Sequence, residues 1–109
     1  EYKTHIGSEG AAVGIDVGQY LLRLRDDLRW FVVDPNDGFI YVQGYYTSTA
    51  DQIVIKATGG PVIGSCSYIE NTYGWTAEGA TLTFTAINVD EKCGGEKLFF
   101  TDNPFTLQP

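Results

Sequence analysis

The sequence predicts an all-β protein, a small up-and-down antiparallel β-barrel of about eight short strands, with a β-sandwich as the alternative. Two observations lead to this fold class. The composition favours strands and turns, with 13 Gly, 7 Tyr and 6 Phe but no Met. Short segments of alternating side chains also follow one another with hairpin-length links, and none keeps a helical period. Such a meander hides its edges best by closing into a barrel.

The first four strands are predicted at 18–25, 29–34, 39–47 and 51–57. In the first of them, Tyr20, Leu22 and Leu24 share one face of the strand. A Pro-Asn-Asp-Gly turn at 35–38 separates the second strand from the third, because Pro presets φ and Gly accepts the left-handed conformation. Gly44 lies inside the third segment and predicts a bulge or a sharp bend.

The remaining strands are predicted at 62–68, 72–76, 80–87 and 96–101, followed by a short tail with Phe105 and Leu107. The weakest pattern is that of 62–68. The clearest is that of 80–87, whose apolar residues occupy one face and whose threonines occupy the other. A Glu-Gly pair at 78–79 predicts a tight hairpin, and Gly94-Gly95 predicts a turn before the last segment.

Residues 1–17 lie outside this pattern and predict an extended N-terminal arm that precedes the barrel domain of residues 18–109. The segment is rich in Gly and other small residues, and its sparse apolar anchors are Ile6, Val13, Ile15 and Val17. Two placements are open. The arm could add as a β-strand to a neighbouring subunit, or it could lie as a strap across the mouth of its own barrel.

The charge balance excludes two classes of partner. The chain has 7 Lys and Arg against 14 Asp and Glu, a formal net charge of -7. Nucleic-acid phosphates and anionic lipids would be repelled by such a surface. The apolar runs are also too short for membrane insertion. We therefore expect no nucleic-acid partner and no insertion into a membrane.

Cys66 and Cys93 are the two cysteines of the chain, and His5 is its single histidine. This set lacks CxxC spacing and the ligands of a zinc site. The cysteines form either a disulfide or two buried free thiols. A disulfide would imply an extracellular or periplasmic setting, and we expect a secreted, extracellular protein. The chain begins at Glu1 without a Met, which indicates a removed leader or a shortened chain.

From Gly18 onward the chain resembles the small secreted lipocalin-like domains of bacteria. The matching features are, in order, Gly18-x-Tyr20, Arg29-Trp30, the Pro35 to Gly38 turn, Gly44-Tyr45, Cys66, Thr72-Tyr73-x-Trp75, Gly79 with Leu82-Thr83-Phe84-Thr85, Asp90-x-x-Cys93 and Pro104-Phe105. The resemblance implies a calycin-type barrel in which Cys66 pairs with Cys93. The chain departs from the family pattern after the second cysteine, where an Arg is usual and this sequence has Gly94-Gly95-Glu96.

Candidate catalytic and metal-binding residues are scarce. His5 lies on the arm, and the carboxylate pairs Asp26-Asp27 and Asp90-Glu91 lie at predicted turns, where solvated side chains are usual. The turn that begins at Asp34 lacks the spacing of an EF-hand. We therefore expect no enzyme activity, no catalytic residue, no metal and no cofactor.

Two functions fit these features. The first is an extracellular structural subunit that assembles head-to-tail with copies of itself into a filament, its arm exchanging as a strand between subunits. The second is a lipocalin-like carrier that binds a small apolar or aromatic ligand inside the barrel. The pocket of such a carrier would be lined by Trp30, Tyr41, Tyr45 and Trp75.

Overall fold

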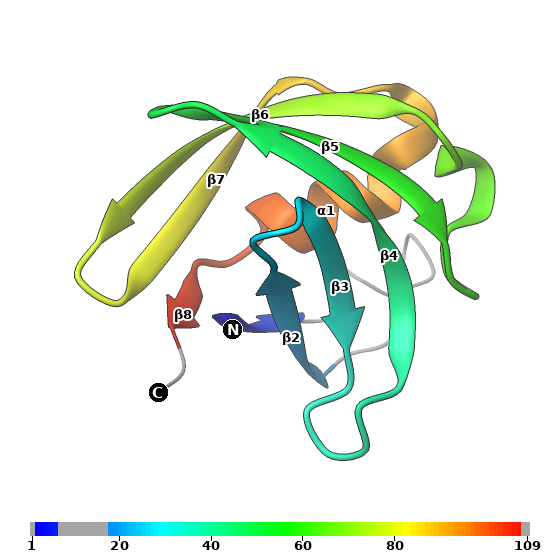
Figure 1. Ribbon diagram of the computed structural model, residues 1–109, viewed down its shortest axis with the longest axis horizontal. Helices are drawn as coiled ribbons and strands as arrows, with labels where there is room; N and C mark the ends of the chain where they lie inside the picture. Colours follow the sequence, from blue (N-terminus) through cyan, green and yellow to red (C-terminus); the bar gives the residue numbers. More distant parts are fainter. Residues whose placement is uncertain (1, 7–17, 108–109) are drawn as a thin grey trace.

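The structure is a computed structural model that describes residues 2–6 and 18–107. The strands of these residues form a closed antiparallel barrel in sequence order, and β8 returns to pair with β1 (Figure 1). The strands are β1 (Tyr2–Ile6), β2 (Gly18–Leu24), β3 (Arg29–Val33), β4 (Ile40–Ser48), β5 (Gln52–Gly59), β6 (Glu70–Glu78), β7 (Thr81–Asn88) and β8 (Phe105–Leu107). The helical elements are the 3-10 turns η2 (Gly64–Cys66) and η3 (Glu91–Cys93) and the α-helix α1 (Gly94–Thr101). The predicted all-β barrel is confirmed.

The strands β2 to β7 occupy the segments in which the sequence alternates most clearly. The predicted bend at Gly44 is confirmed, since the pairing of β4 with β5 shifts register between Gln43 and Gly44. A Cβ atom at position 44 would collide with the carbonyl oxygen of Lys56, so the close approach of these two strands requires glycine there. The hairpin between β6 and β7 is also confirmed, because Gly79 has a φ of 58°.

Two of the predicted strands are wrong. The segment 62–68 folds into turns around η2, and the segment 96–101 belongs to α1. A strand would place the neighbours Phe99 and Phe100 on opposite faces, whereas a helix points both inward, and both are buried. Glu96 shares their face, because residues three and four apart are neighbours on a helix. The burial of two adjacent aromatic rings against the barrel therefore favours the helix.

β1 and β8 take the places of the two missing strands. Tyr2–Ile6 pairs with β2 along its whole length and with β8 at its start. Residues 2–6 therefore belong to the barrel of their own chain, whereas the sequence analysis places them in an arm that precedes the barrel domain. The reason is that a closed barrel needs a strand between β2 and β8. Ile6 ends β1, while Val13, Ile15 and Val17 lie outside the described residues.

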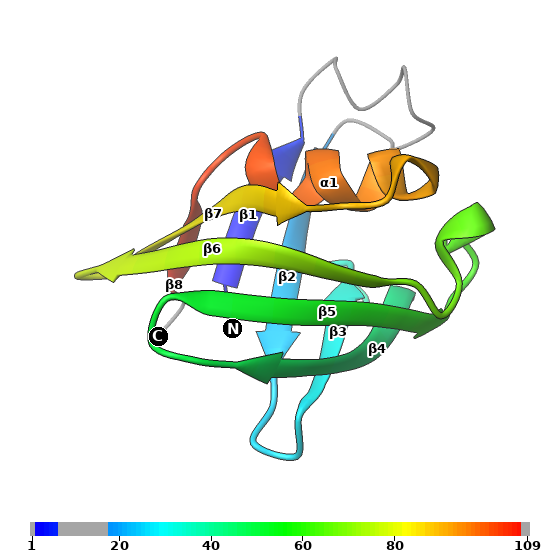
Figure 2. The ribbon, with the colours of Figure 1, turned by 90° about the horizontal axis from the view of Figure 1, so that it is seen from above.

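The barrel core is mostly aromatic and includes side chains from α1, which lies across the far end of the ring of strands (Figures 1 and 2). Phe100 packs against rings from four strands, with centroid distances of 5.1 Å to Phe84, 5.3 Å to Tyr73, 5.8 Å to Trp30 and 6.2 Å to Phe105. The buried core residues are Tyr20, Leu22, Trp30, Val32, Ile53, Ile55, Ala57, Tyr73, Leu82, Phe84, Phe99, Phe100 and Phe105.

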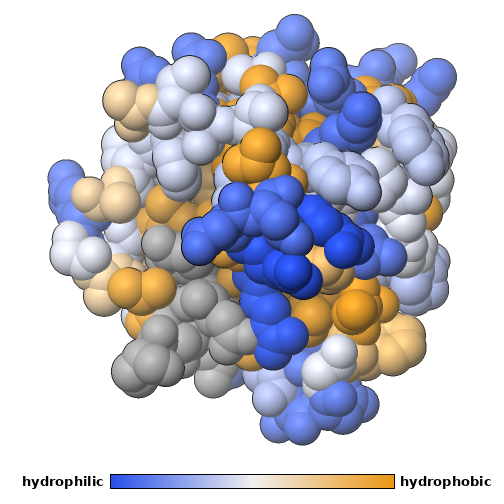
Figure 3. Space-filling model, in the orientation of Figure 1, coloured by the Kyte–Doolittle hydropathy of each residue, from blue (hydrophilic) through white to orange (hydrophobic). Residues whose placement is uncertain are grey.

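The near end of the barrel is polar. Hydrophilic side chains gather over the turn between β2 and β3, at the centre of the face in Figure 3. Arg25 and Asp27 form an ion pair of 2.9 Å in this turn. Among the described residues, no helix has the length and apolar character that crossing a membrane would need.

Candidate functional site

The barrel contains a cavity of about 270 Å³ between the strands and the start of α1. Its walls come from β2 to β5, from the segment around η2, and from η3 and α1. The aromatic lining residues are Tyr20, Trp30, Tyr41, Phe99 and Phe100. The aliphatic ones are Val32, Val42, Ala57, Val62 and Ile63. The polar groups include Ser65, Lys92 and Glu96, so the cavity is an apolar chamber with few charges.

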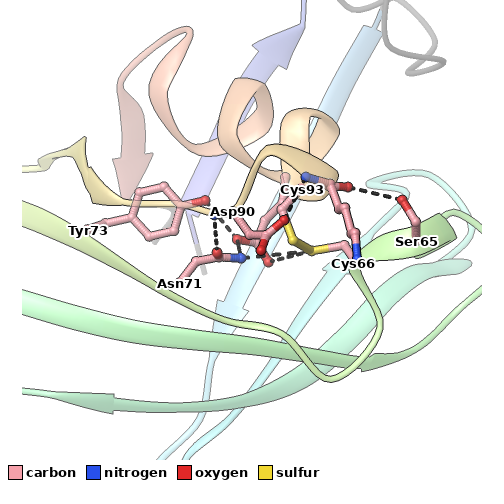
Figure 4. The surroundings of a disulfide bond; sticks show 8 residues. Ser65, Cys66, Asn71, Tyr73, Asp90 and Cys93 are labelled. Carbon is pink, nitrogen blue, oxygen red and sulfur yellow. Dashed lines mark hydrogen bonds between the residues drawn. A yellow bond between two sulfur atoms is a disulfide. The ribbon is translucent and has the colours of Figure 1, made fainter.

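Glu96 is held in one orientation by two donors from β6. Its Oε2 accepts a hydrogen bond of 2.7 Å from the Tyr73 hydroxyl and one of 2.9 Å from Asn71 Nδ2. Asn71 is itself fixed, because its Oδ1 accepts a hydrogen bond of 2.8 Å from the backbone N–H of Asp90 (Figure 4). This amide is buried and fully engaged. The carboxyl group of Glu96 is therefore positioned before any ligand arrives.

The other oxygen of Glu96 has a different environment. Oε1 lies 3.7 Å from Cys66 Sγ, which carries no proton because Cys66 is in a disulfide. Within the described residues, no hydrogen-bond donor contacts Oε1. The two described donors to this cavity-lining carboxyl group therefore both contact Oε2.

Burial sets the protonation of this site. Desolvation raises the pKa of Glu96 to about 7, although the hydrogen bonds from Tyr73 and Asn71 act in the opposite direction. Burial, together with the neighbouring Glu96, raises the pKa of Tyr73 far above its ordinary value. The Tyr73 hydroxyl therefore stays protonated across the neutral pH range and donates a hydrogen bond to Glu96.

A disulfide joins the two 3-10 turns beside the cavity. Cys66 at the end of η2 is bonded to Cys93 at the end of η3, as the lipocalin-like resemblance implies (Figure 4). Both cysteines are buried. The Ser65 hydroxyl adds a hydrogen bond of 3.2 Å to the carbonyl oxygen of Lys92. The disulfide therefore fixes the wall of the cavity that carries residues 62–66.

The structure brings together two of the four aromatic residues that the sequence assigns to a pocket. Trp30 and Tyr41 line the cavity. The Tyr41 hydroxyl donates to Asp34 Oδ2 over 3.0 Å, and burial followed by the Asp34 contact raises the pKa of Tyr41 to about 12. Tyr45 is 51% exposed. Trp75 lies elsewhere, and its Nε1 donates to the carbonyl oxygen of Thr49.

Sequence reasoning missed Glu96, Asn71 and Tyr73. The available signal was the spacing of Cys93, Glu96 and Phe100, which fits one face of a helix. The carboxylate pairs serve local structure instead. Asp27 accepts from the backbone of Arg29, and Asp90 caps η3 by accepting from the backbone N–H of Lys92. Among the described residues, no group of His, Cys, Asp and Glu is arranged to hold a metal ion.

The chain matches no protein-family model, no curated protein and no solved structure. Its function therefore has to be inferred from the geometry of the cavity.

Replacing Glu96 by glutamine is expected to change the pH dependence of stability. The pKa of Glu96 is raised from 4.5 to about 7 on folding. The carboxyl group is neutral in both states at low pH, and between about pH 4.5 and about pH 7 it ionises in the unfolded chain before it does so in the folded protein, so stability falls across this window. Glutamine stays neutral and can still accept from Tyr73 and Asn71. At about pH 8, Glu96→Gln should be more stable than wild type by roughly 1–3 kcal/mol.

Urea denaturation at about pH 4 and about pH 8 measures this difference. At the lower pH, which lies below the unfolded pKa of 4.5, the variant and wild type should be nearly equal. Glu91→Gln is the matched control, because Glu91 is an exposed carboxylate on the neighbouring turn, and it should follow wild type at both pH values. Equal pH dependence of Glu96→Gln and wild type would show that the carboxyl group is not desolvated.

Proposed function

We propose that this protein is a non-enzymatic extracellular carrier, which binds one small and mainly apolar or aromatic molecule inside its barrel. The observation that carries the proposal is the cavity of about 270 Å³, lined mostly by aromatic and aliphatic side chains. Pockets that hold small molecules have this composition, with a few polar groups that orient the ligand. This volume lies just below the usual range for drug-sized ligands, so the ligand has about one or two rings.

Other features support a carrier outside the cell. The buried Cys66–Cys93 disulfide is typical of proteins from oxidising compartments. The lipocalin-like resemblance also supports a carrier. The donors to Glu96 Oε2 hold the carboxyl group still, so a ligand meets a cavity whose polar group is already oriented.

The alternative proposal, head-to-tail self-assembly, has weaker support from the geometry. In this structure β1 uses one edge for β2 and the other for β8 of the same chain. A filament would need the β1 of a neighbour to replace this strand in each barrel. Self-assembly stays a prediction, and light scattering of the native protein tests it, since a monomer of about 12 kDa would contradict it.

Filling the cavity is expected to weaken binding without unfolding the barrel. Ala57 lines the cavity from β5 and is buried. In Ala57→Leu, the added carbons occupy space that a ligand needs. Binding of the neutral probe naphthylmethanol, measured by isothermal titration calorimetry, should weaken by at least about tenfold, which corresponds to about 1.4 kcal/mol.

The matched control is Ala86→Leu, the same substitution at an exposed position of β7. It should bind naphthylmethanol like wild type. Circular dichroism checks that both variants keep their strands. If Ala57→Leu is folded and binds the probe as tightly as wild type does, the probe lies outside the cavity and the proposal fails.

A further inference from the structure

We propose that the cavity selects organic cations, namely small aromatic or aliphatic amines whose protonated nitrogen pairs with Oε1 of Glu96. The inference rests on the proposed carrier function and names the chemical class of its ligand. The two oxygens of the Glu96 carboxyl group have different surroundings.

The hydrogen bonds of Glu96 leave an acceptor for the ligand. Oε2 accepts hydrogen bonds from Tyr73 and Asn71. Oε1 contacts the sulfur of Cys66, which is in a disulfide and therefore carries no hydrogen to donate. An ionised carboxylate only accepts hydrogen bonds, and Oε1 has its full capacity left. A ligand with an N–H donor satisfies this oxygen, and a charged donor makes the stronger bond. A ligand carboxylate would be repelled.

The rest of the lining also favours a cation. The rings of Tyr20, Trp30, Tyr41, Phe99 and Phe100 line the same cavity as Glu96. The negative faces of aromatic rings attract ammonium groups, and this attraction grows when the cation is desolvated. The formal net charge of -7 adds a long-range attraction for cations. Carboxylate, rings and overall charge therefore select the same ligand class.

Lys92 is the one cationic side chain among the described residues that line the cavity, and it is exposed on η3. The ammonium group of Lys92 is where an anionic ligand would bind instead of at Glu96. A carboxylate probe therefore has to be compared with an amine probe directly.

The pairing makes binding sensitive to pH. An ammonium group favours the ionised form of Glu96, so the amine binds best above a pH of about 7 and loses affinity as Glu96 takes up a proton below it. The other ionisable groups near the carboxyl group are Tyr73 on β6, Tyr20 and Tyr41 on β2 and β4, and Asp90 and Lys92 at η3.

Three probes on one naphthalene frame test the inference: naphthylmethylamine, naphthylmethanol and naphthoate. Their affinities are measured by isothermal titration calorimetry for wild type, Glu96→Gln and the control Glu91→Gln. At about pH 8, wild type should bind the amine at least about tenfold more tightly than the alcohol. That preference should fall by about tenfold at about pH 5. Glu96→Gln should lose the preference, because its affinity for the amine falls to about that for the alcohol, while Glu91→Gln should behave as wild type.

The outcomes distinguish a failure of the cation selectivity from a failure of the carrier function. Equal binding of amine and alcohol by wild type, or an amine preference that survives in Glu96→Gln, overturns the cation selectivity and leaves the carrier in place. Preferential binding of naphthoate overturns it in favour of recognition through Lys92. If wild type binds none of the three probes, the carrier function fails as well. Binding of the alcohol by Glu96→Gln shows that the variant cavity is folded.

Discussion

Replacing Phe100 by alanine is expected to lower the free energy of unfolding by about 3–5 kcal/mol. Phe100 is 1% exposed and contacts aromatic rings from four strands across the barrel as well as Phe99 on its own helix. Removing its ring deletes a large apolar surface and leaves a cavity that rigid strands cannot close. Since Phe100 is on the same helix face as Glu96, the substitution also loosens the support of the binding cavity.

Urea denaturation, followed by tryptophan fluorescence and circular dichroism, measures the loss. Phe39→Ala is the matched control, because it removes the same ring at a position that is 51% exposed. The ring contact of Phe39 is with Tyr41, so this control should lose less than about 1 kcal/mol. If the two variants were equally stable, α1 would not be packed into the barrel as the structure has it.

The strands that the sequence predicted correctly are those whose pattern is local. In 80–87 the alternation of apolar residues and threonines is complete within eight positions, and the structure has β7 at Thr81–Asn88. The turn residues are just as local, because Gly79 has the positive φ of a tight hairpin in its own chain segment. Pattern and turn chemistry suffice wherever a strand needs only its neighbours in sequence.

The remaining elements depend on contacts between distant segments. The run at 96–101 is short and apolar, and such runs fit a strand or a helix equally well until the surroundings are known. Here the cavity end of the barrel accepts a helix that buries Phe99 and Phe100 together. β1 and β8 are likewise defined by closure of the barrel. β1 pairs with β2 and β8 pairs with β7, and the two strands then pair with each other, which leaves no sheet edge open.

The candidate site was predicted only in part, because some of its residues follow a local pattern and others depend on distant contacts. Trp30 and Tyr41 lie on strands whose inward faces the alternation indicates, and both line the cavity. Glu96 follows two glycines and begins a segment that the sequence predicts to be a strand. Its burial comes from α1 and from two hydrogen-bond donors on β6 that are more than twenty positions away. No local pattern contains that information.

Removing the disulfide by the double substitution Cys66→Ala and Cys93→Ala is expected to cost about 3.5 kcal/mol of unfolding free energy. The bond closes a loop with a sequence separation of 27, and without it the unfolded chain regains the entropy that this loop had lost. The folded state also changes, because η2 and η3 lose the covalent link that holds residues 62–66 against α1. Binding of naphthylmethanol should therefore weaken together with stability.

Urea denaturation and calorimetry measure the two effects, in the double variant and in wild type treated with a thiol reductant. Ser65→Ala is the matched control, because it removes the hydrogen bond to Lys92 between the same two turns and keeps the disulfide. This control should lose no more than about 1 kcal/mol. A loss of stability with unchanged probe binding would mean that the disulfide acts on the unfolded chain alone. A loss of both, reproduced by reduction, would show that the covalent link between η2 and η3 also shapes the cavity.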